Sequence, residues 1–312
     1  MAKPMPAAEV EITAQLVRAL LAGQHPDLAL LPVTFLASGW DNAIFRLGDS
    51  LLARMPRRAL GATIIEHEQR WLPVLAPVLP VKIPAPERTG IPALGYPYPW
   101  SVVPFLPGTP AADVLDVLDG VDGAGVLDGA GALDFTGLAA GLGKFLAAMH
   151  RPAPVDAPPN PFRGVPLARR AETVEANLPV VADQVDEAAV RRAWDEALAA
   201  RAYDGPPLWL HGDLHPANIL VSHGHVSAII DFGDITAGDP AADLSVAWMM
   251  LPLDVHQAYR SAYGGADEDL WRRARGWALG QAVMFLAHSA DNPQLRRVGR
   301  RTLAAVLSDS RA

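Results

Sequence analysis

The stretch LWLHGDLHPANILVSHGHVSAIIDFGD, residues 208–234, decides the fold of this chain. Its apolar runs at 208–210, 219–221 and 226–230 predict three short strands, and residues 222–225 predict a turn between the last two. Asp213 and Asn218 lie in the loop between the first two runs, and Asp231 follows the third. The pattern therefore predicts two carboxylates and one carboxamide on loops at strand ends.

These three side chains suit one kind of chemistry. Gly212 lets the loop turn tightly and Pro216 stiffens it, so Asp213 can be held facing a substrate hydroxyl. The amide oxygen of Asn218 is a neutral hard ligand and Asp231 is a charged one, and both suit a magnesium ion that keeps several waters. Phosphoryl transfer depends on positioning and charge neutralisation more than on covalent chemistry. The set therefore favours ATP-bound magnesium beside an alcohol.

Three motifs carry a resemblance to a known family, namely HGDLHPAN at 211–218, IIDFGD at 229–234 and GDPAADL at 238–244. Together they resemble the aminoglycoside phosphotransferase family, whose members share the fold of protein kinases. The resemblance implies an α+β, bilobal protein-kinase-like fold. We expect a nucleotide-binding small lobe, with an antiparallel sheet plus a helix, at residues 1–104. A large, mainly helical lobe with the catalytic and acceptor-binding roles is expected at residues 105–312.

The resemblance also implies a role for each matched residue. Asp213 is the base or orienting group for the accepting hydroxyl, whereas Asn218 and Asp231 bind magnesium. His211 braces the catalytic loop. Two further residues of the GDPAADL segment are expected to support that loop structurally, Asp239 and Asp243.

The first part of the chain predicts the sheet of the small lobe. A helix is expected within residues 7–24 and strands at 33–37, 43–47 and 51–55. In the family, the first connection between strands is the nucleotide loop, and backbone amides of a small-residue turn can hold phosphates. Ser38, Gly39 and Asn42 are the candidates here. A Gly-x-Gly-x-x-Gly pattern is absent from this region, so an ordinary hairpin turn is the alternative interpretation.

The third strand, LLARMP, departs from the kinase pattern. Kinases place a lysine there to hold the nucleotide phosphates, whereas the matching residue here is Arg54, which keeps the charge and adds a bidentate fork. We expect Arg54 to pair with Glu68 on a helix at residues 62–75. Glu66 on the same helix is expected to be a solvated surface charge.

A further nucleotide contact is implied at residues 98–106, YPWSVVPFL. This apolar run matches the strand that becomes the hinge between lobes in the family, where backbone groups contact adenine. Pro104 cannot donate a hydrogen bond, so the donor must be a neighbour such as Phe105 or Leu106. We expect adenine near Val103, Phe105 and Leu106.

Composition limits the class of protein. The chain has 312 residues, 50% apolar content and no cysteine, which excludes a disulfide framework and a thiol nucleophile. No apolar run reaches the length of a bilayer span and the N-terminus lacks an apolar signal core, so we expect a cytoplasmic protein with no membrane partner. The net charge of -8 argues against nucleic acid and is compatible with a cationic small substrate.

Two other classes of function fit part of the sequence. A metal-dependent hydrolase would hold zinc with imidazole and carboxylate ligands. The spacing of the candidate ligands argues against a hydrolase, because His223 and His225 fall in the expected turn. The ligands would be drawn from His211, Asp213, His215, His223, His225 and Asp231. A non-catalytic nucleotide-binding protein is suggested by Arg54, although such a module has no need of an intact catalytic loop.

The segment at 111–134 contains two copies of Val-Leu-Asp-Gly and several aspartates, which suggests calcium. The EF-hand spacing is not met, so we expect a flexible, family-variable insertion that could form part of the acceptor site. The terminal region from residue 244 predicts helices, and its acidic trio at 267–269 is typical of a helix N-terminal turn.

The function that these observations favour is ATP-dependent transfer of the γ-phosphate to a hydroxyl of a small molecule. The acceptor is expected to be an aminoglycoside or a related antibiotic such as a macrolide. Phosphorylation of a small metabolite, either an amino alcohol or a sugar, is the alternative, because acceptor pockets are built from variable loops that one sequence does not decode.

Overall fold

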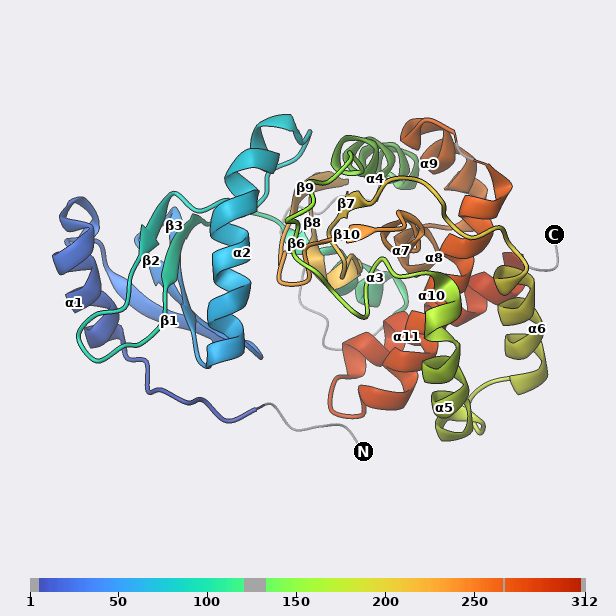
Figure 1. Ribbon diagram of the computed structural model, residues 1–312, viewed down its shortest axis with the longest axis horizontal. Coiled ribbons are helices and arrows are strands. Elements are labelled where there is room, and N and C mark those ends of the chain that lie inside the picture. Colours follow the sequence, from blue (N-terminus) through green and yellow to red (C-terminus); the bar gives the residue numbers. More distant parts are fainter. Residues whose placement is uncertain (1–5, 121–132, 266, 310–312) are drawn as a thin grey trace. The chain divides into compact units, whose positions relative to one another are not determined.

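The computed structural model describes residues 6–120, 133–265 and 267–309. The chain divides into two compact units. The N-terminal unit comprises the chain up to Val78 together with Lys82–Leu106, and the C-terminal unit comprises Leu79–Val81 and the described chain from Pro107 onward. Figure 1 labels the elements of each unit.

The N-terminal unit is built on a five-stranded antiparallel sheet with the order β1-β2-β3-β5-β4. Its core joins one face of this sheet to α1, through Leu20 and Leu21 of the helix and Phe45 and Trp100 of the strands, all of which are buried. The strands are β1 (Val33–Ser38), β2 (Asn42–Leu47), β3 (Leu51–Pro56), β4 (Arg88–Gly90) and β5 (Trp100–Pro104). The helices are α1 (Ala14–Gln24) and α2 (Ala59–Leu75), with short 3-10 turns at Pro26–Leu28 and Ala76–Val78.

The C-terminal unit is mainly helical and contains two small sheets (Figure 1). In one sheet β7 (Leu208–Leu210) pairs with β10 (Thr236–Gly238), and in the other β8 (Ile219–Ser222) lies between β6 (Thr109–Pro110) and β9 (His225–Ile229). The helices are α3 (Ala111–Leu118), α4 (Phe135–Met149), α5 (Ala171–Val181), α6 (Glu187–Leu198), α7 (Ala241–Leu244), α8 (Val246–Met250), α9 (His256–Tyr263), α10 (Glu268–His288) and α11 (Pro293–Asp309). Short 3-10 turns lie at Leu167–Arg170, Pro216–Asn218 and Leu253–Val255.

Helix α10 is the central helix of this unit, because it packs against α5, α6, α7 and α11. Asp267 caps its first turn by accepting a hydrogen bond of 2.8 Å from the Leu270 amide. Glu268 and Asp269 follow in that turn, where negative charge is favourable to the helix dipole. The acidic trio at 267–269 is therefore a helix N-terminus, as the sequence indicated.

The fold class predicted from the sequence is confirmed. The strands around residues 208–230 and 33–55 are present within about two residues of their expected ends. One expectation was wrong, since residues 111–118 of the supposed insertion form helix α3, which packs against α11. Residues 121–132 of that segment lie outside the described residues.

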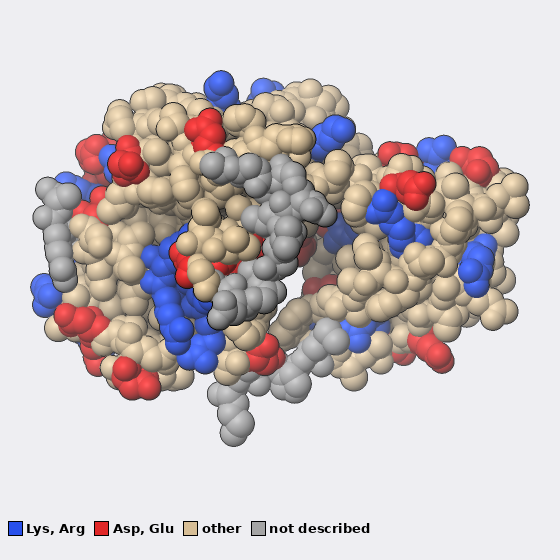
Figure 2. Space-filling view, turned by 180° about the vertical axis from the view of Figure 1, so that it is seen from behind, with Lys and Arg blue, Asp and Glu red and all other residues tan. Residues whose placement is uncertain are grey.

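Charged side chains of both signs share the surface shown in Figure 2. Some of them join elements, as where Arg297 of α11 pairs with Asp116 of α3 at 2.6 Å. Within the described part of the chain, no helix has the length and apolar character that crossing a membrane requires.

Candidate active site

The loop after β7 turns at a position that only glycine accepts. Gly212 has a φ of +86°, and a Cβ added there would lie 2.2 Å from the backbone oxygen of Asp234. Both conditions exclude other residues, because a side chain would be strained by the backbone and would clash with it. The tight turn carries the chain from β7 directly to Asp213.

A buried carboxylate anchors this turn from α7. Asp243 accepts hydrogen bonds from the backbone amides of His211, at 2.7 Å, and Gly212, at 2.9 Å. Nε2 of His150 lies 3.4 Å from the same carboxylate, which is 1% exposed. Burial alone would raise the pKa of Asp243, but the hydrogen bonds with His150 and with the Gly212 amide hold this pKa below its ordinary value. Asp243 thus holds the backbone of this turn through two amides.

His211 braces the loop from within. Its Nε2 lies 3.0 Å from the carbonyl oxygen of Ile230, and its Nδ1 accepts from the Asp213 amide at 3.3 Å. This pattern fixes the tautomer, with the proton on Nε2 donated to the carbonyl. The ring also contacts Phe232 with a centroid distance of 4.5 Å. His211 therefore ties the loop of Asp213 to the chain that follows β9.

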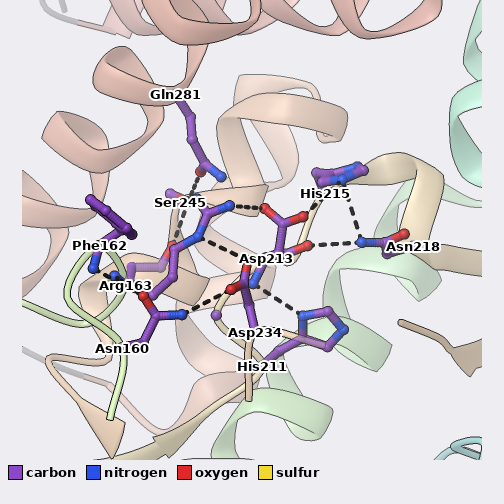
Figure 3. A network of polar contacts seen from close by, with 12 residues as sticks. Asn160, Phe162, Arg163, His211, Asp213, His215, Asn218, Asp234, Ser245 and Gln281 are labelled. Carbon is purple, nitrogen blue, oxygen red and sulfur yellow. Dashed lines mark hydrogen bonds and ion pairs between the residues drawn. The ribbon is translucent and has the colours of Figure 1, made fainter. Parts of the chain in front are cut away.

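Asp213 lies at the centre of a polar network, which Figure 3 shows. Its Oδ1 accepts a 2.6 Å hydrogen bond from Nη2 of Arg163, and its Oδ2 lies 3.5 Å from Nε2 of His215. Burial raises the pKa of Asp213, but the charges of Arg163 and His215 outweigh it and hold the pKa well below its usual range. The carboxylate is thus ionised at neutral pH and can accept a hydrogen bond from a hydroxyl.

The backbone at Asn218 lies next to the residue that precedes Asp231, because β8 and β9 form a hairpin. The Asn218 carbonyl accepts from the Ile230 amide at 2.9 Å, one residue before Asp231. Nδ2 of Asn218 donates to the backbone oxygen of Asp213 at 3.0 Å, so Oδ1 is the atom that can take a cation. Asp231 is exposed and has a left-handed φ of +62°, a conformation that aspartate and asparagine adopt more readily than most other residues except glycine. Two hard oxygen donors at one hairpin end fit magnesium, which needs few protein ligands.

Three residues of the network were missed by sequence reasoning. Arg163 also donates from Nε to Asp234 at 3.3 Å, and Nδ2 of Asn160 donates to the other oxygen of Asp234 at 2.8 Å. Asp234 is the second aspartate of the motif IIDFGD, so the sequence did contain a signal for it. Arg163 and Asn160 lie in a proline-rich segment that carries no periodic pattern, so the sequence offered no signal for them.

Asp239 makes different contacts from those expected. Its carboxylate pairs with Arg273 of α10 at 2.8 Å and accepts from the Ala241 amide at 3.0 Å. It therefore joins the start of α7 to α10, and its support of the catalytic loop is indirect.

The pair expected in the N-terminal unit is present. Nη1 of Arg54 lies 2.8 Å from both carboxylate oxygens of Glu68, and the two residues are 8% and 1% exposed. Glu66 is exposed, as predicted. Arginine at this position thus makes the pair with the helix glutamate that the kinase pattern requires.

The turn proposed to hold phosphates is closed by its own backbone in this structure. The Gly39 amide donates to the Asn42 carbonyl at 2.9 Å, and Arg57, a residue not singled out from the sequence, donates to the Gly39 carbonyl at 2.8 Å. Oδ1 of Asn42 is buried without a hydrogen-bond partner. Ser38 is the last residue of β1 and pairs with Ala43. Ser38, Gly39 and Asn42 thus lie at the same β1–β2 connection, and the guanidinium of Arg57 contacts that connection at Gly39.

The expected adenine strand is β5 and the residues after it. Val103 is buried and pairs with Leu52 of β3. The Phe105 amide donates to the Ser50 carbonyl at 2.7 Å, which removes it as a donor to adenine. Leu106 is left as the candidate donor of the two that were proposed.

The zinc-hydrolase alternative finds no support among the described residues. His223 and His225 are exposed at the β8–β9 turn, away from the network of Asp213. In the described part of the chain, no three histidine, aspartate or glutamate side chains are grouped so that they could hold a metal ion.

Comparisons with known proteins agree with this geometry. The sequence matches the model of the phosphotransferase enzyme family over residues 32–277. No curated protein sequence shows a significant match. Among solved structures, the GDP complex of an aminoglycoside 2'-phosphotransferase-IIIa has 17% identity and a TM-score of 0.63, with 96% of this chain and 100% of that chain covered.

Two further solved structures are similar in fold. The macrolide 2'-phosphotransferase MphH from Brachybacterium faecium has 23% identity and a TM-score of 0.59, with 93% of this chain and 97% of that chain covered. A streptomycin-ATP-APH(2")-IIa ternary complex has 15% identity and a TM-score of 0.56, with 96% and 99% covered. At these identities the likeness establishes the fold.

Proposed function

Because this chain belongs to the phosphotransferase enzyme family, we propose that it transfers the γ-phosphate of ATP to a hydroxyl group of a small molecule. Family membership makes it a phosphotransferase with an alcohol group as acceptor. The choice of ATP as donor and the nature of the acceptor are the proposal.

The observation that carries the proposal is the placement of Asp213, Asn218 and Asp231. Asp213 is a half-buried ionised carboxylate, held on both oxygens, in a loop whose backbone is anchored at His211 and Gly212. In the proposed transfer, the acceptor oxygen bonds to the γ-phosphorus and the bond from that phosphorus to the bridging oxygen breaks. The hydroxyl proton passes to Asp213, and ADP leaves. Holding the hydroxyl in line is the larger part of this catalysis.

Asn218 and Asp231 would hold magnesium through Oδ1 and the carboxylate. When bound, the ion would neutralise charge on the phosphates of the nucleotide. The Asn218 side chain would have two roles. Its nitrogen donates to the backbone oxygen of Asp213, and its oxygen would remain to hold the ion.

The nucleotide side of the proposal rests on the N-terminal unit. Arg54, fixed by Glu68, supplies a cationic group for the phosphates, and its fork keeps the charge that lysine supplies in kinases. Further contacts are proposed for the β1–β2 turn and for the end of β5, at Ser38, Gly39, Asn42, Val103, Phe105 and Leu106. The Phe105 contact would be through the side chain or carbonyl, because its amide is already bonded.

For the acceptor we propose an aminoglycoside or a related antibiotic. Proteins of similar fold include an aminoglycoside 2'-phosphotransferase, a complex with streptomycin and ATP, and a macrolide 2'-phosphotransferase. Those names describe the neighbours and support the acceptor class for this chain by analogy of fold.

A coupled assay for ADP release tests the proposal. The purified protein is incubated with ATP and magnesium against aminoglycosides, macrolides, amino alcohols and sugars, and mass spectrometry identifies any product with an added phosphoryl group. We expect acceptor-dependent ADP release with an antibiotic. Release only with a metabolite would refute the antibiotic class, and product formation with GTP but not ATP would refute the donor.

A further inference from the structure

The proline-rich segment at residues 151–166, here called the strap, is fixed to β7, which precedes the loop of Asp213, and to β10 and the residue after it, which follow the β8–β9 hairpin. The Trp209 amide donates to the Arg151 carbonyl at 2.9 Å, where the strap begins. The hydroxyl of Thr236, on β10, donates to the Pro158 carbonyl at 2.7 Å. Near the end of the strap, the Asp239 amide donates to the Gly164 carbonyl at 2.8 Å. The strap is therefore held along its length and is no free loop.

The residue after Arg163 makes the closest of these contacts. Gly164 has a φ of +64°, and a Cβ there would lie 2.4 Å from a methyl carbon of Leu210 and 3.2 Å from the Cα of Gly238. A Cβ on Gly238 would lie 2.1 Å from the Gly164 carbonyl oxygen. Two glycines thus let the strap lie directly against β10. This backbone contact fixes the position from which Arg163 reaches the site.

Arg163 bridges two carboxylates of the catalytic region (Figure 3). Nη2 lies 2.6 Å from Oδ1 of Asp213, and Nε lies 3.3 Å from Oδ2 of Asp234. Asn160 completes the bridge, since its Nδ2 donates to Asp234 at 2.8 Å and its Oδ1 accepts from the Arg163 amide at 3.2 Å. Side chain and backbone of Arg163 are both held.

The charges explain why a fixed cation is needed here. Asp213, Asp231 and Asp234 place three carboxylates within 22 residues of chain around one loop and one hairpin end. The side chains of Arg163, Asp213 and Asp234 are 22%, 27% and 39% exposed, so water screens them only in part. A planar guanidinium can donate to both carboxylates at once and separate them, which a point charge does less well.

We propose that Arg163 is a positioning residue for phosphoryl transfer. It holds Oδ1 of Asp213, so that the carboxylate keeps one orientation and the acceptor hydroxyl bonds to the lone pairs that Arg163 leaves open. This role rests on the proposed function, because it needs Asp213 to receive a hydroxyl. No feature of the sequence assigns it, since the strap lies outside the family motifs.

Steady-state kinetics of Arg163→Ala and Arg163→Lys test the role. Removing a group that orients a reacting residue should lower kcat about 10- to 100-fold. The KM for ATP should stay within about threefold of the wild type, and lysine should recover part of the loss. Arg169→Ala is the matched control, because it removes an exposed arginine six residues further along the chain. An unchanged kcat in Arg163→Ala, or a rise in the KM for ATP as large as the fall in kcat, would overturn the proposal.

Chemical rescue separates positioning from a general loss of structure. Guanidinium ion at non-denaturing concentration should raise the kcat of Arg163→Ala and leave that of Asp213→Ala unchanged. Absence of rescue would also overturn the proposal. Thermal unfolding of each variant is measured beside it, because a fold defect would lower the melting temperature and would not respond to guanidinium.

A double-mutant cycle tests the contact without any turnover. Arg163→Ala, Asp213→Ala and the double variant are compared with the wild type by urea unfolding, and coupling beyond additivity is expected. Additive effects would overturn the contact on which the role depends. If the wild type phosphorylates no acceptor while the cycle shows coupling, the proposed function fails and the Arg163–Asp213 pair stands.

Discussion

Nη1 of Arg54 lies 2.8 Å from each carboxylate oxygen of Glu68, and both side chains are almost completely buried. A buried pair of this kind is costly to break from one side, because the remaining charge loses its partner in a poorly solvated place. The ion pair therefore links the stability of the N-terminal unit to the phosphate-binding role proposed for Arg54.

Each single substitution should consequently affect both properties. Arg54→Ala or Glu68→Ala is expected to lower the free energy of unfolding by about 3–5 kcal/mol and to weaken ATP binding. Exchanging the charges, with Arg54→Glu and Glu68→Arg combined, should recover part of the ATP affinity lost in each single charge reversal. Urea unfolding and titration calorimetry measure the two effects. A double variant that recovers no ATP affinity would argue against pairing as the basis of binding.

Asp213→Ala should separate catalysis from binding. Without the carboxylate, the acceptor hydroxyl loses both its orientation and its proton acceptor, and turnover is expected to fall by about 10²–10⁴. ATP should still bind, because the proposed nucleotide contacts lie on other residues. Single-turnover phosphorylation and ATP calorimetry provide the two readouts. Near-normal turnover would remove Asp213 from the catalytic role.

Asp231→Asn should weaken the response to magnesium. Asparagine tolerates a left-handed backbone, so the φ of +62° is kept while the charged ligand is lost. The magnesium concentration for half-maximal activity should rise by at least about tenfold. His225→Ala, at the exposed start of β9 in the same hairpin, serves as control and should leave the response unchanged. Equal magnesium titrations for Asp231→Asn and the wild type would place the ion elsewhere.

The stability of the C-terminal unit should depend on the protonation of His256. This residue is 7% exposed, with its ring edge-on to Trp248 at 5.2 Å and its Nε2 3.3 Å from the Leu251 carbonyl. Burial lowers the pKa of His256 below the ordinary histidine value of 6.5. Below pH 6.5 the unfolded chain therefore binds a proton at His256 more readily than the folded chain does. The stability that the neutral, buried His256 contributes is complete above pH 6.5 and is lost as the pH falls.

Urea unfolding between about pH 8 and pH 5.5 measures the pH dependence of stability. This range extends about one to two units on either side of the ordinary histidine pKa. The wild type should lose stability faster than His256→Gln as the pH decreases, since glutamine does not titrate. Parallel pH dependence in the two proteins would contradict the assignment to His256.

Local sequence determined the part of the site that lies within residues 208–234. Gly212, Asp213, Asn218 and Asp231 are held by one turn and one hairpin, whose hydrogen bonds join residues close in the chain. Turn chemistry and strand alternation act over such short distances, so the motif was sufficient to place them. The Arg54–Glu68 pair was equally accessible, since it joins a strand to the next helix 14 residues later.

Tertiary structure alone decided the rest of the site. Arg163 reaches Asp213 from 50 residues away, because two glycines let the strap lie against β10 and backbone bonds fix it there. The grip of Asp243 on the loop likewise comes from the packing of α7, across 32 residues. Such contacts depend on how distant segments pack, and no local pattern of hydrophobicity or turn residues records that. The motif thus specified the phosphoryl-transfer chemistry, while packing supplied the cation beside its central carboxylate.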